Sequence, residues 1–338
     1  MCAPAGQTQR PEHFSPRVKC CSFHPDLPNF LVGQILLEKD SSSVRARSVI
    51  EQRIRDGHAV TPLGIHQPAR YSLLYDNAPG SFGRSMSMRC PYFIDEEGGR
   101  CGIWKYRNAV CATYFCKHER GATGYNFWNV LKQMLSSAEI DLAVWCAFEL
   151  KLASRSLEKL VAYGGSRDRT RLNESDLDER ADPAERSVNW GNWAGREEEF
   201  FRKCAELVAP LKWREVVSLC GPKTRVLANL AQEAHVRLKS TELPQGLIPA
   251  GFHLFGVRQD RAMISTYSSN DPIEVPVTLI QLLRYFDGRP TGEVLTDIET
   301  SENVIIHEPL VRKLNDFRVL VERPQDREVV ARSPDEGV

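Results

Sequence analysis

The sequence predicts a mainly α protein with some β structure, in the α+β class, built from three regions of different character. Apolar residues recur at three- and four-residue intervals through residues 122–250, which is the spacing of amphipathic helices. A cysteine-rich segment precedes this helical middle, and a pattern of strands and short helices follows it. We therefore expect an irregular, metal-tied N-terminal region, a helical middle domain and a small C-terminal unit.

The composition is that of a soluble globular chain long enough for two or three domains. The chain has 338 residues, and Lys plus Arg number 44, as do Asp plus Glu, so the formal net charge is zero. Because phosphate binding needs a basic excess, the balance disfavours nucleic acid as a partner. No stretch approaches the roughly 20 apolar residues of a membrane span, and the first residues lack the apolar core of a secretory signal. We expect a cytoplasmic protein with no membrane association.

The first third of the chain is expected to be irregular. Residues 1–19 are polar and contain prolines, which predicts a disordered lead, and residues 20–121 form the cysteine-rich region. Two short helices are predicted there, one over 29–39 and one that ends at Gly57. The following span, 61–89, is rich in glycine and proline, which break regular structure. A loop of that length needs a tether, and a bound metal would supply one.

The helical domain is predicted over residues 122–250. Its first helical stretch stops at Gly164-Gly165, a C-terminal signal, and the polar residues 166–188 predict an exposed linker. Further helices are expected from Gly195 to Pro210, from Trp213 to Gly221, and after Pro222.

The C-terminal unit is predicted over residues 252–322, and residues 323–338 are expected to form a disordered tail. Alternating residues around Gln259-Asp260-Arg261 predict a β-hairpin. Three short helical stretches follow, VTLIQLLRYFDG, TGEVLTDIE and HEPLVRKLNDF, and the strand-like RVLVE closes the unit. This order of elements is typical of a winged helix-turn-helix.

The chemistry of the chain is concentrated in its cysteines. Six of the ten form an adjacent pair followed by four more, separated by ten, nine and four residues: Cys20, Cys21, Cys90, Cys101, Cys111 and Cys116. Thiolates are soft ligands for zinc and iron–sulfur clusters, and a reducing cytoplasm favours them over disulfides. The spacing therefore predicts a metal site in which the last four converge, joined by at least one member of the pair.

The identity of the metal is left open by the residues. Four thiolates suffice for one zinc ion or one 4Fe-4S cluster. Only the last two cysteines approach the tight spacing of structural zinc sites, so the pattern favours the 4Fe-4S cluster, with Zn²⁺ as the alternative. Backbone amides around Gly99, Gly102 and Asn108 are expected to donate to the sulfurs. Of the two histidines near the cysteines, His24 is a further candidate ligand and His118 is interpreted as a surface residue.

The other cysteines have a simpler interpretation. Cys146, Cys204 and Cys220 each lie on an apolar helix face. Buried thiols commonly pack as small hydrophobic side chains. We expect these three to belong to the core.

The segments KCCSFHPDLPNFLVG and GRCGIWKYRNAVCATYFC resemble the YkgJ-like cysteine-cluster family of zinc- or iron-chelating proteins. The resemblance covers about the first third of the chain and is specific over residues 99–116, where the following positions fill the family pattern: Gly99, Arg100, Cys101, Ile103, Trp104, Arg107, Cys111 and Cys116. The family usually has an earlier cysteine before the pair, where this chain has Pro16 and Arg17, and a proline where it has Asn108.

The resemblance implies a cysteine-cluster metalloprotein with a redox or maturation role. A similar cluster occurs beside flagellin lysine methylases, which implies a modifying enzyme with an accessory cluster as another alternative. The sequence has no phosphate loop, HExxH or Gly-x-Ser-x-Gly motif, so it predicts no reaction and leaves enzymatic activity open.

The C-terminal unit resembles the PqqD-like winged helices that recognise peptides, most closely at the turn Asp287-Gly288-Arg289. Its stretch TGEVLTDIE is acidic, and the next helical stretch has only Arg312 and Lys313 as basic residues, whereas a DNA-reading helix is basic. We therefore expect a peptide or protein partner here, which makes an adaptor with a structural metal the alternative function. A structural cap on the helical core is the other interpretation of this unit.

Overall fold

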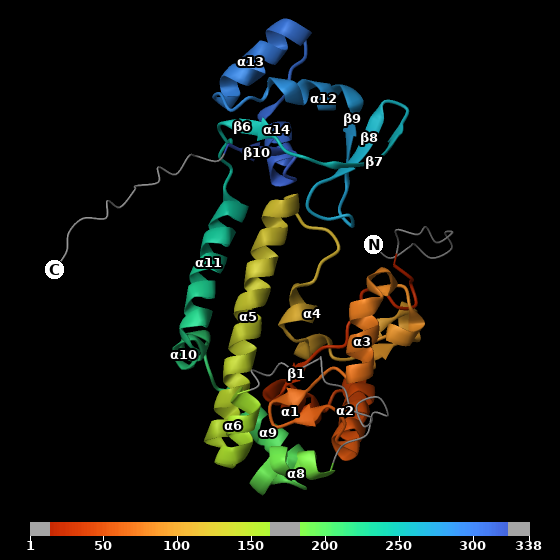
Figure 1. Cartoon of the computed structure of the whole chain (residues 1–338), viewed down its shortest axis with the longest axis vertical. Coiled ribbons are helices and arrows are strands. Elements are labelled where there is room, and N and C mark those ends of the chain that lie inside the picture. Colours follow the sequence, from red (N-terminus) through yellow and green to blue (C-terminus); the bar gives the residue numbers. More distant parts are fainter. Residues whose placement is uncertain (1–13, 163–182, 324–338) are drawn as a thin grey trace, which may run out of the picture. The chain divides into compact units, whose positions relative to one another are not determined.

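The computed structural model describes residues 14–162 and 183–323, and within them it is mainly helical with small sheets (Figure 1). This confirms the predicted class, mainly α with some β. The chain divides into two compact units: unit 1 joins Met1–Cys116 to Phe127–His235, and unit 2 joins Lys117–Asn126 to Val236–Val338. The cysteine-rich region and most of the helical middle thus share unit 1. The predicted tail, most of the predicted lead and linker residues 166–182 lie outside the described residues.

The first helices of unit 1 form where the sequence predicts them. Helix α1 spans Asn29–Leu37, and helix α2 spans Val44–Asp56 and ends at Gly57, which adopts the left-handed conformation. Helix α1 packs closely on α9 (Glu197–Val208). A Cβ at Gly33 would lie only 1.9 Å from the carbonyl oxygen of Phe201, so this close approach requires glycine.

The strands of the cysteine-rich region are very short. Strands β1 (Leu27–Pro28), β3 (Gly64–Ile65) and β2 (Val60–Thr61) form an antiparallel sheet in that order, and β4 (Phe93–Ile94) pairs with β5 (Arg100–Cys101).

The predicted loop over 61–89 is less irregular than we expected. It contains helix α3, Ala69–Asn77, which begins directly after Pro68 and ends before Pro79. The helix forms because glycine and proline flank the segment ARYSLLYDN and none lies inside it.

Polar side chains hold this region together over long sequence distances. The amide nitrogen of Asn29 donates to the carbonyl oxygens of Pro62 at 3.0 Å and Ala143 at 2.9 Å, and the residue is fully buried. Part of the predicted lead also packs, since Phe14 and Val18 are buried. These two apolar side chains anchor the segment that precedes the Cys20-Cys21 pair.

The helical middle contains α5 (Gly121–Glu149) and α6 (Ser154–Ala162) in place of the one stretch predicted. The chain breaks between them at Lys151, whose φ of 53° is left-handed. The helices α8 (Pro183–Trp190), α9, α10 (Trp213–Leu219) and α11 (Pro222–Lys239) follow. Cys146, Cys204 and Cys220 are buried, as predicted.

Unit 2 contains the predicted hairpin and three helices. Strands β7 (His253–Arg258), β8 (Arg261–Ser265) and β9 (Ile273–Pro276) form an antiparallel sheet in that order. Helices α12 (Val277–Leu282), α13 (Thr291–Glu302) and α14 (Glu308–Asp316) follow, and β10 (Leu320–Glu322) pairs with β6 (Leu247–Pro249). Strands β9 and β6 were not predicted from the sequence. The core is apolar and takes Val294, Ile298 and Val311 from the helices.

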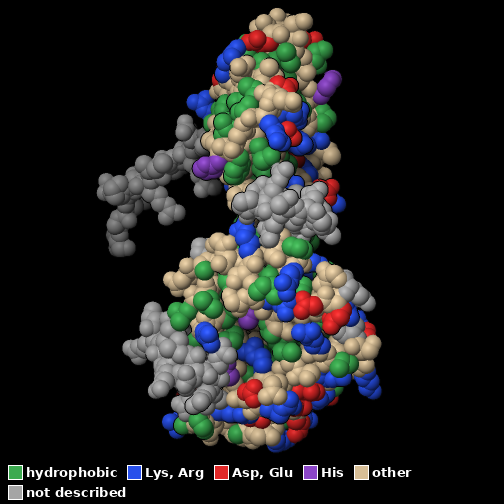
Figure 2. All heavy atoms as spheres, turned by 90° about the vertical axis from the view of Figure 1, so that its right-hand side faces the viewer, with side chains coloured by type: hydrophobic (Ala, Val, Ile, Leu, Met, Phe, Trp, Pro, Cys, Tyr) green, Lys and Arg blue, Asp and Glu red, His purple; other side chains and the backbone are tan. Residues whose placement is uncertain are grey.

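The surfaces of the two units differ on the face that Figure 2 shows. Basic and acidic side chains are interspersed on unit 1, whereas hydrophobic side chains gather on unit 2. All six residues of β7 are exposed, including Leu254, Phe255 and Val257, and the register with β8 is irregular between Leu254 and Gly256. Among the described helices, none is both long and apolar enough to cross a membrane.

Candidate functional site

Backbone contacts within unit 1 bring the first cysteines together. The amide of Cys90 donates to the carbonyl oxygen of Cys21 at 2.6 Å, which joins two segments that are far apart in the sequence. Cys101 lies in β5 directly opposite Phe93 of β4, three residues after Cys90. The Cys20-Cys21 pair, Cys90 and Cys101 therefore occupy one small part of the unit.

Cys111 is the third residue of α4 (Ala109–Thr113), whose N-terminus is held by two side chains. The side-chain oxygen of Asn108 accepts the amide of Cys111 at 3.0 Å, and its nitrogen donates to the carbonyl oxygen of Asp26 at 3.1 Å. Glu139 of α5 accepts the amide of Ala109 at 2.7 Å. An acceptor and an acid at a helix N-terminus satisfy its unpaired amides, so both fix the backbone that carries Cys111.

The buried thiols are close enough to change one another's pKa. Burial raises the pKa of Cys90, and the nearby Cys111 and Cys101 raise it further. Burial also raises the pKa of Cys111 to about 12, with smaller contributions from Cys101 and Cys20. Desolvation thus disfavours the free thiolate at these positions, and a metal ion would favour it.

The Cys20-Cys21 pair behaves differently. A hydrogen bond from Cys21 lowers the pKa of Cys20 to about 6, and the charges of Arg107 and Lys19 act in the same direction. The same hydrogen bond raises the pKa of Cys21. Cys20, which is exposed, is therefore the more acidic thiol of the pair.

Cys116 lies beside Tyr114. Burial raises the pKa of Tyr114, and Cys116 and Cys20 raise it further. The structure thus brings Cys20, Cys21, Cys90, Cys101 and Cys111 within electrostatic reach of one another, and connects Cys116 to them through a tyrosine.

The donor set suits a soft metal by its chemistry, although the thiols are not arranged as a closed site. All nine cysteines within residues 14–162 and 183–323 are thiols, and over the same ranges no three His, Cys, Asp or Glu side chains form a metal-ligand group. Sulfur atoms that share one metal lie about 4 Å apart, given metal–sulfur bonds of about 2.3 Å. Metal binding would therefore draw these segments closer together.

Two residues near the thiols were not predicted as part of the site. The guanidinium carbon of Arg107 lies 3.6 Å from the ring centroid of Trp104, and its charge favours the thiolates of Cys20, Cys101 and Cys111. Burial raises the pKa of Glu139 to about 7. The sequence signal for Glu139 was an acid among the apolar positions of α5, and the signal for Arg107 was a basic residue between two cysteines.

The amides of Gly99 and Gly102 themselves donate to the carbonyl oxygens of Glu96 and Tyr92. The neighbouring backbone of Ile103 forms a hydrogen bond with the sulfur of Cys101 and favours its thiolate. His24 stacks on Tyr71 with ring centroids 3.7 Å apart. His118 belongs to unit 2.

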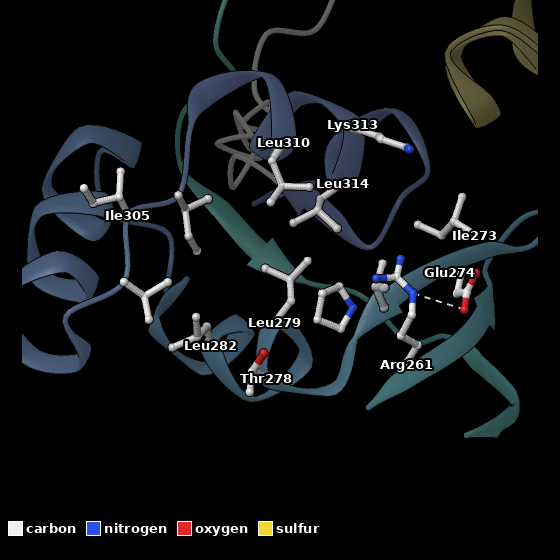
Figure 3. A pocket seen from close by; sticks show the side chains of 14 residues that line it. Arg261, Ile273, Glu274, Thr278, Leu279, Leu282, Ile305, Leu310, Lys313 and Leu314 are labelled. Carbon is white, nitrogen blue, oxygen red and sulfur yellow. Dashed lines mark ion pairs between the residues drawn. The ribbon is translucent and has the colours of Figure 1, made fainter. Parts of the chain in front are cut away.

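Unit 2 has a pocket of about 370 Å³ between β9, α12, α14 and residues 304–306 (Figure 3). Apolar side chains, chiefly leucines and isoleucines, line most of it, and the charged side chains Arg261, Glu274 and Lys313 lie toward one end. Arg261 pairs with Glu274 at 3.1 Å, while Lys313 has no ion pair with another described residue. In the described sheet, β9 pairs only with β8 and is therefore an edge strand, and its residues Ile273–Pro276 line the pocket.

Comparison with known proteins adds no relative. No family model matches the sequence, and neither curated proteins nor solved structures give a significant match.

Proposed function

We propose that this protein binds a metal group through the cysteines of unit 1 and serves a redox or maturation role. The observation that carries the proposal is the mutual electrostatic influence of five thiols contributed by separate segments of the chain. The core thiols Cys146 and Cys204 form only a pair, whereas the five thiols of the candidate site come from segments that surround residues 20, 90, 101 and 111.

The proposed ligands are the six cysteines predicted from the sequence: Cys20, Cys21, Cys90, Cys101, Cys111 and Cys116. A 4Fe-4S cluster is the first choice and Zn²⁺ the alternative, because the spacing lacks a second tight knuckle. The exposure of Cys20 would place the metal group close to the surface.

The test is an anaerobic purification of the full chain with analysis of iron, labile sulfide and zinc. The redox proposal expects iron with sulfide and a visible charge-transfer absorbance that dithionite bleaches. Zinc has a filled d-shell and gives neither signal. A colourless protein with full zinc occupancy would rule out the redox role and leave a structural metal.

Serine substitutions separate ligands from core cysteines. Cys101→Ser and Cys111→Ser should lose the metal and make the span 61–89 more sensitive to protease. Cys204→Ser, in the helical core, should keep the metal and cost only packing. Equal metal content in all three variants would show that the ligand assignment is wrong.

The pocket of unit 2 favours a second candidate function, a peptide-binding adaptor. The open edge of β9 offers backbone hydrogen bonds to an extended peptide, and the apolar pocket beside it offers space for a side chain. The free charge of Lys313 complements an acidic residue. We propose an extended peptide with a leucine or isoleucine next to an aspartate or glutamate.

Synthetic peptides test this candidate directly. Fluorescence anisotropy should show binding of a peptide with an acidic residue beside leucine, and weaker binding when lysine replaces that acid. Lys313→Glu should reverse the preference, whereas Lys239→Glu, on α11, should leave it unchanged. Indifference of the wild-type protein to the peptide's charge would contradict the proposed occupant.

A further inference from the structure

Arg107 is held among the cysteines by two contacts that fix its side chain. Its guanidinium carbon lies 3.6 Å from the ring centroid of Trp104, and Nη1 donates to the carbonyl oxygen of Cys111 at 3.3 Å. Trp104 itself is 65% exposed, so its ring contributes little to the core. A guanidinium over the face of tryptophan is a favourable cation–π arrangement, and here it orients the cation.

One donor of this side chain lacks an acceptor. The Nε atom of Arg107 is buried, and no described residue accepts a hydrogen bond from it. A buried donor without a partner is unfavourable, which is why such atoms point to a missing group. The donor would be satisfied by sulfur, because metal-bound thiolates and cluster sulfides accept hydrogen bonds.

The surrounding charges point the same way. Arg107 donates to the carbonyl oxygen of Cys111, and Nζ of Lys19 donates to the carbonyl oxygen of Gly99 at 2.7 Å, two residues before Cys101. Two cations are thus held against the backbone of the cysteine segments. Four thiolates carry more negative charge than one zinc ion neutralises, so a fixed cation at this point lowers the free energy of the loaded site.

We infer that Arg107 is the charge-compensating residue of the cysteine site, held over Trp104 so that its buried Nε–H and its charge face the thiolates. The inference rests on the proposed metal function and deepens it. Arg107 acts through the ligands and is therefore a positioning residue.

Metal affinity measures this role without reference to any activity. The full-length apoprotein is titrated with Co²⁺ and with Zn²⁺ against a competing chelator, and thiolate-to-cobalt absorbance reports the ligands. Arg107→Gln should weaken affinity by about 10- to 100-fold, the range found for groups that support metal ligands. Arg107→Lys should recover part of the loss, because it keeps the charge but not the planar stack.

Two further variants complete the design. Trp104→Ala keeps the charge of Arg107 and removes its support, so it should weaken affinity less than Arg107→Gln. Arg84→Gln is the matched control, since this exposed arginine donates to the carbonyl oxygen of Gly80 and is not among the charges that act on the thiols. Far-UV circular dichroism verifies that each variant folds. If Arg107→Gln does not fold, the metal affinity of Trp104→Ala is measured in its place.

The outcomes are distinct. Wild-type affinity in Arg107→Gln, or in Trp104→Ala if that variant carries the test, overturns the role of Arg107 and leaves the metal site intact. A wild-type protein that binds neither metal and purifies anaerobically without iron overturns the metal function itself, and the role of Arg107 with it. When iron is present, Arg107→Gln should also lower the reduction potential, because removing a cation disfavours the added electron.

Discussion

The N-terminal region of unit 1 and the C-terminal unit reach an ordered structure by different means. In unit 2, apolar side chains at regular intervals meet in one core, and Val294, Ile298 and Val311 are fully buried there. In residues 14–116, the strands are only two residues long, and polar groups such as Asn29 and Asn108 join distant segments.

Stability therefore depends on a repeated hydrophobic pattern in unit 2 and on single residues in residues 14–116. A core built on periodicity tolerates hydrophobic substitutions of similar volume, because many neighbours share the loss. A region held by individual hydrogen bonds and close contacts tolerates substitution less well, since each lost partner leaves a buried polar group unsatisfied. Substitutions in the two regions should therefore differ in effect.

The largest effect is expected at the contact between α1 and α9. Gly33→Ala places a Cβ against the backbone of α9 and should destabilise the protein by about 4 kcal/mol or more, because neither helix backbone can yield locally. Chemical denaturation monitored by tryptophan fluorescence measures the change. Gly80→Ala is the control, since a Cβ there meets no atom within 4 Å. Equal midpoints for the two variants would contradict the close packing.

The next effect tests polar anchoring in unit 1. Asn29→Leu places a larger, apolar side chain at this buried position and leaves the carbonyl oxygens of Pro62 and Ala143 without their donor, and should cost about 3 kcal/mol. In unit 2, Leu314→Met should cost less than about 1.5 kcal/mol at a position that is equally buried. Similar denaturation midpoints for both variants would remove the distinction between the regions.

A smaller effect is expected in unit 2, because its described residues also include polar contacts between distant segments, such as those of Arg120. Arg120 pairs with both carboxylate oxygens of Asp316 at 2.9 Å and donates to the carbonyl oxygens of Leu238 and Ser240. Arg120→Ala should destabilise unit 2 by about 2 kcal/mol, since Asp316 remains buried without its partner. Arg289→Ala, which removes exposed ion pairs, should change the midpoint little.

The smallest effect concerns pH and His24. Burial lowers the pKa of His24 to about 4, from an ordinary value of 6.5, so the folded protein keeps this ring neutral. Below pH 6.5 the unfolded chain binds a proton that the folded chain excludes, and stability is lost as pH falls from about 6.5 toward 4. His24→Phe should remove about 1 kcal/mol of this loss of stability between pH 7 and pH 5.5. If the free energy of unfolding of wild type and variant changes with pH in parallel, His24 is not the source of this loss.

The sequence predicted unit 2 well because its elements follow hydrophobic periodicity. The hairpin, α12, α13, α14 and β10 all lie where alternation or helical spacing places them. Strand β9 was missed because its segment, IEVP, is short and ends in proline. The break at Lys151 was missed because the apolar spacing continues across it, and left-handed backbone at a lysine has no strong sequence signal.

The candidate site was only partly predictable. Clustering identified the six cysteines, because residue type and spacing are visible in the sequence. Glu139, which supports the site, was not identified, because it accepts the amide of Ala109 from thirty positions away and no local sequence pattern indicates that contact. Long-range hydrogen bonds depend on the tertiary fold, whereas turn and helix signals are local.

The irregular register of β7 affects how readily this strand can pair with another chain. An edge strand with exposed apolar side chains is a template for pairing with other chains, and a bulge that twists the edge away discourages it. The irregularity between Leu254 and Gly256 therefore protects the solubility of the protein. Deleting Phe255 would regularise the strand and favour aggregation while every residue of the core remained in place.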